Sequence, residues 1–217
     1  MGMLGQATRN RVRGICTALA KPFAALGISP NQVSLLGVVF ALVAAAFVFQ
    51  GRYLLAFFFA VLAASMDLID GSVAKLLNKR SPFGNYFDAL MDKFVELFLY
   101  AAFAPRFPLE TALAIGLSFI ASYAKPRAGL VIVTDNRDWP GIGEHAERLL
   151  VFLLGLLASA FVPSLAGFKP MQLALGLIAV LALAGCLQRM EFAKKLIQEA
   201  EAKGALLPYL KEGRERE

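Results

Sequence analysis

The stretch MDLIDGSVAKLLNKRSPFGNYFDALMDK, residues 66–93, places four aspartates between two apolar segments. The residues before it, YLLAFFFAVLAAS at 53–65, carry no charged side chain, and the largely apolar FVELFLYAAFA follows at 94–104. A carboxylate at the centre of a bilayer costs about 2.5–3.5 kcal/mol on insertion scales, so acids in such a setting indicate function. The stretch therefore predicts two helices that turn back on each other, with a functional site beside the turn.

The composition is that of an integral membrane protein. Of the 217 residues, 58% are hydrophobic, and the mean hydropathy is +0.62. Soluble domains are typically about 45–50% apolar. The net charge of +6 is modest and its basic residues lie at predicted helix ends, so we expect no nucleic-acid partner. Cys16 and Cys186 show no metal-ligand spacing.

Apolar runs near the length needed to cross a bilayer recur along the chain. They predict six spanning helices at about residues 31–49, 53–77, 84–104, 109–133, 146–161 and 170–187. Before them, Ile15, Leu19, Phe23 and Leu26 recur at helical spacing, which favours an interfacial helix over about residues 5–28. The fold class predicted is all-α integral membrane: six transmembrane helices plus an N-terminal interfacial helix. We expect a single domain over residues 1–217, ending in a charged cytoplasmic tail at 188–217.

The distribution of Lys and Arg predicts the orientation. With the N-terminus in the cytoplasm, all of the 22 basic residues fall on the cytoplasmic side except Arg52, Arg106 and Lys169. We therefore expect a multi-pass protein of the cell membrane with both termini inside.

The four aspartates are expected to meet near the cytoplasmic face. Asp67 follows a helical run from residue 53, roughly 21 Å at 1.5 Å per residue, while Asp88 and Asp92 open the next helix. The spacings 67/70 and 88/92 each place a pair on one helix face. Hard oxygen ligands without His or Cys favour Mg²⁺, Mn²⁺ or Ca²⁺, and four carboxylates suffice for two ions.

Two small residues lie beside the predicted metal site. Gly71 and Ala74 are small residues on the same helix as the first acid pair, and beside a metal site they leave room for a phosphate or a base. The alternative is that the acids form structural ion pairs with Lys75, Lys93 or Lys125.

These residues resemble a known family. Asp67-x-x-Asp70-Gly71-x-x-Ala74-Lys75 followed by Gly84-x-x-x-Asp88-x-x-x-Asp92 is similar to the signature of the CDP-alcohol phosphatidyltransferases. The spacing agrees throughout. The family usually has Arg where this chain has Lys75, and Arg offers a planar fork for a phosphate whereas Lys offers a point charge.

The resemblance implies a site and a reaction. Asp67, Asp70 and Asp88 would hold two Mg²⁺ ions, with Mn²⁺ as a substitute, and Asp92 would lie at the edge of the metal site and act as the base. The donor would be CDP-diacylglycerol or CDP-archaeol in a membrane, the product CMP, and the protein a homodimer. The segment PNQVS resembles the family's Pro-Asn-x-x-Thr. The CDP-lipid would contact Asn31, Gln32, Val33, Ser34, Gly71, Ala74, Lys75, Ser81 and Gly84.

The acceptor is indicated by a weaker resemblance. ASYAKPRAG at residues 121–129 and GIGEHAERLL at 141–150 resemble segments of phosphatidylinositol-phosphate synthases and their archaeal counterparts. Lys125, Arg127 and Arg148 would then bind the phosphate of inositol phosphate. Glycerol-3-phosphate needs a similar anion site and stays open as the acceptor.

A cation transporter is the alternative from another class, because it too would use intramembrane carboxylates. It does not explain Gly71, Ala74 and Gly84 at the family spacing, and the paired broken helices typical of transporters are not seen in the sequence.

Overall fold

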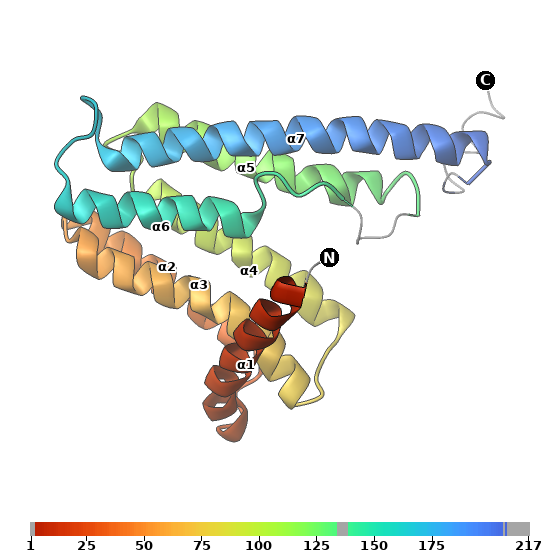
Figure 1. Cartoon of the computed structure of the whole chain (residues 1–217), viewed down its shortest axis with the longest axis horizontal. Helices are drawn as coiled ribbons and strands as arrows, with labels where there is room; N and C mark the ends of the chain where they lie inside the picture. The colour runs from red at the N-terminus through yellow and green to blue at the C-terminus, as the bar shows by residue number, and fades with distance from the viewer. Residues whose placement is uncertain (1–2, 134–138, 206, 208–217) are drawn as a thin grey trace. The chain divides into compact units, whose positions relative to one another are not determined.

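The computed structural model describes residues 3–133, 139–205 and 207. These residues form seven α-helices and no strand longer than an isolated bridge (Figure 1). The helices are α1 (Met3–Ala25), α2 (Pro30–Phe49), α3 (Tyr53–Leu76), α4 (Pro82–Ala101), α5 (Pro108–Ala128), α6 (His145–Phe161) and α7 (Pro170–Ala202).

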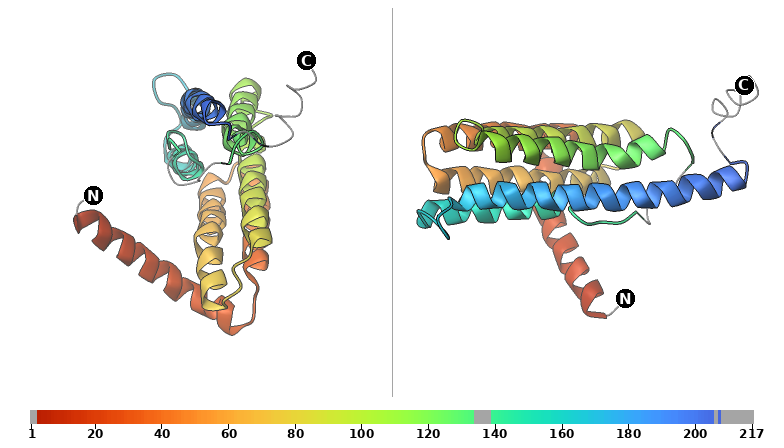
Figure 2. Two further views of the ribbon diagram at one scale, coloured as in Figure 1. Left: turned by 90° about the vertical axis from the view of Figure 1, so that its right-hand side faces the viewer. Right: turned by 90° about the horizontal axis from the view of Figure 1, so that it is seen from above.

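The chain divides into two compact units. The first holds α1 to α4 together with residues 156–161 at the end of α6, and the second holds α5, α7 and the beginning of α6. Within the first unit α2 packs against both α3 and α4, and within the second α5 packs along α7 (Figure 2). The single domain predicted from the sequence stays a prediction.

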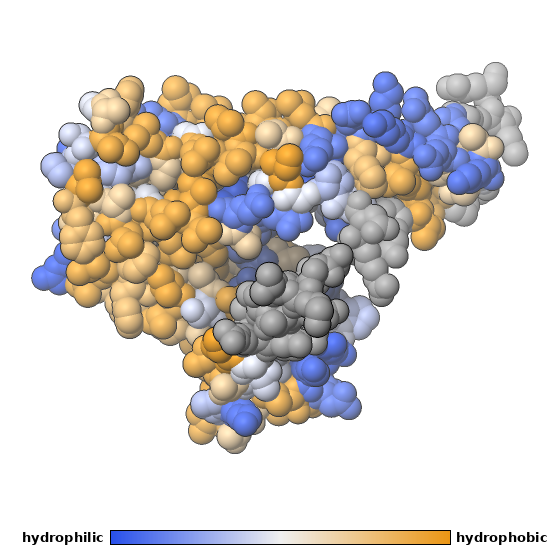
Figure 3. Space-filling model, in the orientation of Figure 1, coloured by the Kyte–Doolittle hydropathy of each residue, from blue (hydrophilic) through white to orange (hydrophobic). Residues whose placement is uncertain are grey.

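The all-α prediction is confirmed, and each of the first five predicted spans coincides with one helix to within about five residues. The sixth, predicted at 170–187, begins with α7, but α7 continues through the first part of the predicted tail to Ala202. Three of the described helices, α2, α3 and α7, are long and apolar enough to cross a membrane. Apolar side chains cover much of the visible surface, whereas polar side chains gather on the C-terminal part of α7 (Figure 3). The chain is thus a helical membrane protein. Six spans stay a prediction, and the tail predicted beyond residue 207 lies outside the described residues.

The helices α2 and α4 begin with the same local device. Ser29 and Ser81 are the N-caps, each in extended backbone, and Pro30 and Pro82 follow at the first helical position. The Ser81 hydroxyl accepts from the Gly84 amide at 2.9 Å. Serine satisfies an amide that the first turn leaves unpaired, and proline costs nothing there because its missing N–H is not needed. Each Ser-Pro pair therefore fixes where a helix of the first unit starts.

The core of the first unit lies between α1, α2 and α3. Val33, Met66, Ile69 and Val73 are buried in one cluster, against which Phe40 packs. Gly37 lets α2 and α3 approach closely, since a Cβ there would meet the Met66 Cβ at 3.3 Å. Close packing of these two helices sets the separation of the polar side chains that lie further along them.

Helix α1 packs on α3 through part of its surface. Ala20 is buried in the core cluster and Phe23 packs against it. Ile15 and Leu19, which the sequence assigned to an apolar face with Phe23, are 61% and 50% exposed. An apolar face left uncovered by the chain suits a helix that lies on a lipid surface. The interfacial helix predicted there remains a prediction.

The second unit contains two close backbone approaches to α7. A Cβ at Gly185 would clash with the carbonyl oxygen of Ile142, and a Cβ at Gly143 would clash with that of Leu181. Gly143 also has a φ of +64°, which disfavours other residues. The segment before α6 is therefore docked on α7 by glycines on both sides.

We expect Gly185→Ala to destabilise the protein, because its new methyl group would press on the Ile142 carbonyl oxygen. Overpacking of this kind costs about 1–3 kcal/mol, which corresponds to a fall of several degrees in Tm for a chain of this size. The measurement is thermal unfolding of the detergent-purified protein.

Gly176→Ala is the matched control on the same helix, because nothing lies within 4 Å of a Cβ at that position. Alanine is the better helix former, so the Tm of this variant should stay equal or rise slightly. Equal Tm values for the two variants would contradict the docking of residues 142 and 143 on α7.

Candidate functional site

The hairpin of α3 and α4 brings aspartates together. Carboxylate oxygens of Asp67, Asp70 and Asp88 all lie within 4.8 Å of one another. Asp70 is only 4% exposed. Three carboxylates at such separations repel one another unless cations compensate them. Their donor set is hard oxygen alone, which fits Mg²⁺ or Mn²⁺.

Asp92 belongs to the same group, which we call the acidic cluster: Asp67, Asp70, Asp88 and Asp92. All four line a cavity of about 10 Å³ together with Gly37 of α2. This volume is close to what one water molecule requires. The structure thus brings all four predicted aspartates together around a space about large enough for one water molecule or one metal ion.

Ser34 of α2 contacts this cluster directly. Its hydroxyl lies 2.5 Å from Asp70 Oδ2 and 3.2 Å from the carbonyl oxygen of Pro30. A serine has one proton to donate, and the shorter distance assigns it to Asp70. The bond fixes the orientation of the Asp70 carboxylate, so α2 takes part in the acidic cluster as well as in the core.

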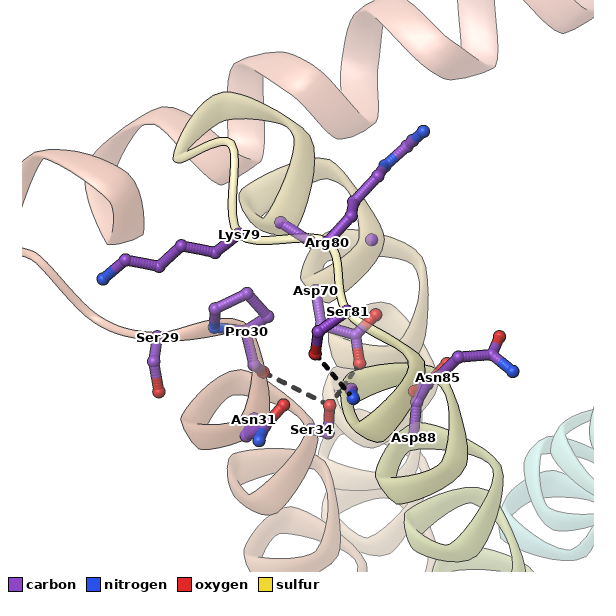
Figure 4. Close-up of a pocket in the computed structure, with 13 residues that line it drawn as sticks. Ser29, Pro30, Asn31, Ser34, Asp70, Lys79, Arg80, Ser81, Asn85 and Asp88 are labelled. Atoms are coloured by element: carbon purple, nitrogen blue, oxygen red, sulfur yellow. Dashed lines mark hydrogen bonds between the residues drawn. The ribbon is translucent and has the colours of Figure 1, made fainter.

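A larger space, called here the large cavity, adjoins the acidic cluster. It has a volume of about 400 Å³, and Asp70 and Asp88 line both spaces (Figure 4). The remaining lining residues come from the starts of α2 and α4, the end of α3 and the loop between α3 and α4: Ser29, Pro30, Asn31, Ser34, Gly71, Ala74, Lys79, Arg80, Ser81, Gly84 and Asn85.

Six of the residues predicted to contact a CDP-lipid line this cavity: Asn31, Ser34, Gly71, Ala74, Ser81 and Gly84. Three do not. The Gln32 side chain accepts from the Ser29 amide at 2.8 Å and completes the cap of α2. Val33 is buried in the core cluster, and Lys75 is exposed outside the lining. Local helix structure thus accounts for Gln32 and Val33.

Part of the cavity wall was not predicted from the sequence. Lys79, Arg80 and Asn85 line it alongside Ser29 and Pro30. The signal was present in the sequence, because the basic pair lies directly before the N-cap Ser81 and Asn85 directly follows Gly84.

A fifth acid, Glu96, was also missed. It continues the spacing of four residues from Asp88 and Asp92 along α4 and is fully buried. Its carboxylate accepts from Lys93 Nζ at 2.5 Å and from the Tyr100 hydroxyl at 3.5 Å. The ion-pair alternative paired Lys93 with the aspartates. In the structure Lys93 forms a salt bridge with Glu96, one turn further along α4.

The three predicted acceptor cations lie in the second unit in different surroundings. Lys125 Nζ lies 5.9 Å from the centroid of the Trp139 ring. Arg127 is exposed in the last turn of α5. Arg148 is buried on α6 and donates from Nη1 to the carbonyl oxygen of Gly143.

Arg189 of α7 is a buried cation of this unit that the sequence analysis assigned to the tail. Its Nη1 donates to the carbonyl oxygen of Ala121 at 2.8 Å and its Nε lies 3.5 Å from that of Pro140. Ala121 precedes Lys125 by one turn of α5. Arg189 and Arg148 therefore both donate to carbonyl oxygens of the segment around residues 140–143.

Apolar helices around a cluster of partly buried carboxylates are typical of a membrane protein that uses a divalent metal ion. The family model of the CDP-alcohol phosphatidyltransferases matches residues 27–185, which contain both cavities. The chain belongs to this family.

Curated relatives span nearly the whole chain. Archaetidylinositol phosphate synthase of Pyrococcus horikoshii is 27% identical over 194 residues, which cover 88% of this chain and 96% of the relative. Phosphatidylinositol phosphate synthase of Streptomyces avermitilis is 28% identical over 225 residues, and this alignment covers 92% of this chain and 88% of the relative.

Solved structures share the fold. The crystal structure of Mycobacterium tuberculosis phosphatidylinositol phosphate synthase with CDP-DAG bound has a TM-score of 0.69 at 22% identity, covering 82% of this chain and 93% of that one. A second crystal structure of that protein, in complex with manganese and citrate, gives the same TM-score.

We expect Ser34→Ala to weaken metal binding, because the Asp70 carboxylate loses the hydroxyl that orients it. Removing a partner of this kind typically lowers metal affinity 10- to 100-fold. The dissociation constant for Mn²⁺ should therefore rise about tenfold, as measured by calorimetry or by the spin-resonance signal of the free ion.

Ser65→Ala is the control, because the Ser65 hydroxyl on the same α3 helix as Asp70 donates to the carbonyl of Val61, at 2.7 Å. It should leave the Mn²⁺ affinity unchanged. Equal affinities in both variants and the wild type would remove Ser34 from the metal site.

Proposed function

We propose that this protein transfers a phosphatidyl or archaetidyl group from a CDP-linked lipid to a hydroxyl of inositol phosphate and releases CMP. The observation that carries the proposal is the acidic cluster, which shares Asp70 and Asp88 with a large cavity lined by other residues of the family signature. The acceptor and the lipid follow from the relatives, which are phosphatidylinositol phosphate and archaetidylinositol phosphate synthases.

The donor is bound in the first unit. Asp67, Asp70 and Asp88 would hold two Mg²⁺ or Mn²⁺ ions, which when bound neutralise a pyrophosphate and polarise its phosphorus. Ser34 keeps the Asp70 carboxylate in position for this role. Gly71 contributes no side chain and has nothing within 4 Å of a Cβ, so it leaves space in the large cavity for the nucleotide.

Asp92 is the proposed general base. It takes the proton from the acceptor hydroxyl as the hydroxyl oxygen attacks the lipid-linked phosphorus. The new phosphorus–oxygen bond forms as the bond to the CMP phosphate breaks, and CMP leaves with the negative charge. Proton transfer from a weakly nucleophilic alcohol is the chemical step that the residues of this chain must supply themselves.

The acceptor phosphate is proposed to bind Lys125, Arg127 and Arg148, and the buried Arg189 joins them as a fourth cation of the second unit. Arginine suits a phosphate because its planar fork donates two parallel hydrogen bonds. Hydrogen bonds to the carbonyl oxygens of Gly143 and Ala121 orient the guanidinium groups of Arg148 and Arg189.

The remaining predictions about the protein's setting are proposals as well. Six spans, an interfacial α1 and termini in the cytoplasm follow from the apolar runs and the basic residues, with α2, α3 and α7 as support. A homodimer follows from the family resemblance alone. The active site would then face the cytoplasm, where CMP and water-soluble acceptors are found.

The function is tested with purified protein, a CDP-lipid and candidate acceptors. We expect CMP release with inositol phosphate and none with free inositol, because the proposed acceptor site binds the phosphate. We also expect no release after EDTA until Mg²⁺ or Mn²⁺ is restored, because the carboxylates and the pyrophosphate need a cation to compensate their charge. Mass spectrometry of the lipid product identifies the acceptor.

Preference for glycerol-3-phosphate would keep the chemistry and change the acceptor. Full activity in chelator would refute the metal site. Cation flux into vesicles without any CMP release would instead identify a transporter.

The role of Asp92 is tested by Asp92→Asn. We expect turnover to fall by 10²- to 10⁴-fold, the usual contribution of a general base, while Mn²⁺ affinity changes only a few-fold. Asp70→Asn is the comparison, because it should abolish turnover and metal binding together. A rate of Asp92→Asn above about a tenth of the wild-type rate would exclude Asp92 as the base.

A further inference from the structure

The loop between α3 and α4 is held in a defined shape. Asn78 has a φ of +54°, in the left-handed region that Asn tolerates better than other side chains. The Lys79 amide donates to the Ala74 carbonyl at 2.9 Å and the Asn78 amide to the Lys75 carbonyl at 3.2 Å. These two bonds form a Schellman motif, which closes a helix C-terminus by a backbone reversal.

This motif places Lys79 beside the large cavity. Its amide is bonded to Ala74, which lines the cavity, and Lys79 itself lines it too. In Figure 4 the Lys79 side chain extends from the loop toward Ser29 and Pro30, whereas Arg80 extends in another direction. Lys79 thus reaches from the α3–α4 loop toward the start of α2.

Negative charge in the large cavity would be stabilised by a cation at the position of Lys79. Asp70 and Asp88 line one part of the cavity and would be compensated by metal ions. A diphosphate bound to those ions brings further negative charge. Within the described part of the chain, the Lys79 ammonium has no hydrogen bond or ion pair with another side chain, so it is available to bind that charge.

We propose that Lys79 binds the phosphates of the donor's nucleotide and supplies the cationic contact that the family signature places at position 75. Lys75 is exposed outside the lining of the large cavity, so the departure from Arg at that position falls on a residue that does not reach the site. This inference rests on the proposed function and adds a determinant of donor affinity to it.

The test is the affinity of CDP, the soluble part of the donor, for detergent-purified protein in Mn²⁺, measured by calorimetry. Lys79→Ala should weaken CDP binding about tenfold, as expected for loss of one charge-assisted hydrogen bond. Lys79→Arg should bind within about threefold of the wild type. Cytidine, which has no phosphate, should bind the wild type and Lys79→Ala equally well.

Lys75→Ala is the matched comparison, because it removes the same charge from a residue that is exposed outside the lining of the large cavity. Its effect on CDP binding should be under about threefold. A large loss in Lys75→Ala or Arg80→Ala together with wild-type affinity in Lys79→Ala would overturn the proposal. An equal loss of affinity for cytidine and for CDP in Lys79→Ala would also overturn the proposal.

The geometry of the loop provides a second test that keeps Lys79 intact. Asn78→Gly retains access to the left-handed region, and Asn78→Val loses it because the side chain is β-branched. We expect weaker CDP binding in the valine variant and wild-type binding in the glycine variant. Equal CDP affinity in the two variants would show that the loop does not position the lysine.

The proposed function fails separately from this inference. A wild-type protein that does not bind CDP in Mn²⁺ would refute the donor site itself. A wild-type protein that binds CDP while Lys79→Ala binds it equally well would refute only the role of Lys79.

Discussion

The burial of the Asp70 carboxylate is the constraint on which the rest of the first unit depends. An ionised carboxylate in an apolar interior is costly unless it is hydrogen-bonded and its charge is compensated. The Ser34 hydroxyl supplies the hydrogen bond, and this requires α2 to pack closely on α3. Gly37 permits that packing three residues further along α2. Charge compensation would come from a bound cation, and the same arrangement orients Asp70 for its proposed role as a metal ligand.

Patterns that arise from one helix were predictable from the sequence. The apolar runs predicted the helices because a segment that buries itself in lipid or in a bundle must be apolar along its whole length. The acid pairs 67/70 and 88/92 predicted a shared site because each pair occupies one helix face and a short turn joins the two helices. Both inferences needed only local spacing.

Residues whose role depends on packing between helices were harder to predict. Gln32 and Val33 lie inside a segment that resembles the nucleotide-binding signature, yet one caps α2 and the other fills the core. Glu96 and Arg189 are buried charges that a sequence presents as ordinary members of a helix and a basic tail. Their partners, Lys93 in one case and the carbonyl of Ala121 in the other, become evident only in three dimensions.

Helix α4 carries a consequence for the biogenesis of the protein. It holds Asp88, Asp92, Lys93 and Glu96 within 20 residues, and α2 and α3 are the first-unit helices apolar enough to span a membrane by themselves. As a spanning helix, α4 would not partition into lipid alone, because each charge opposes insertion. It would need α3 already in place, so that the two enter as a hairpin and the Lys93–Glu96 pair forms before the helix leaves the insertion machinery. The residues of the acidic cluster would thereby also set the order in which the helices enter the bilayer.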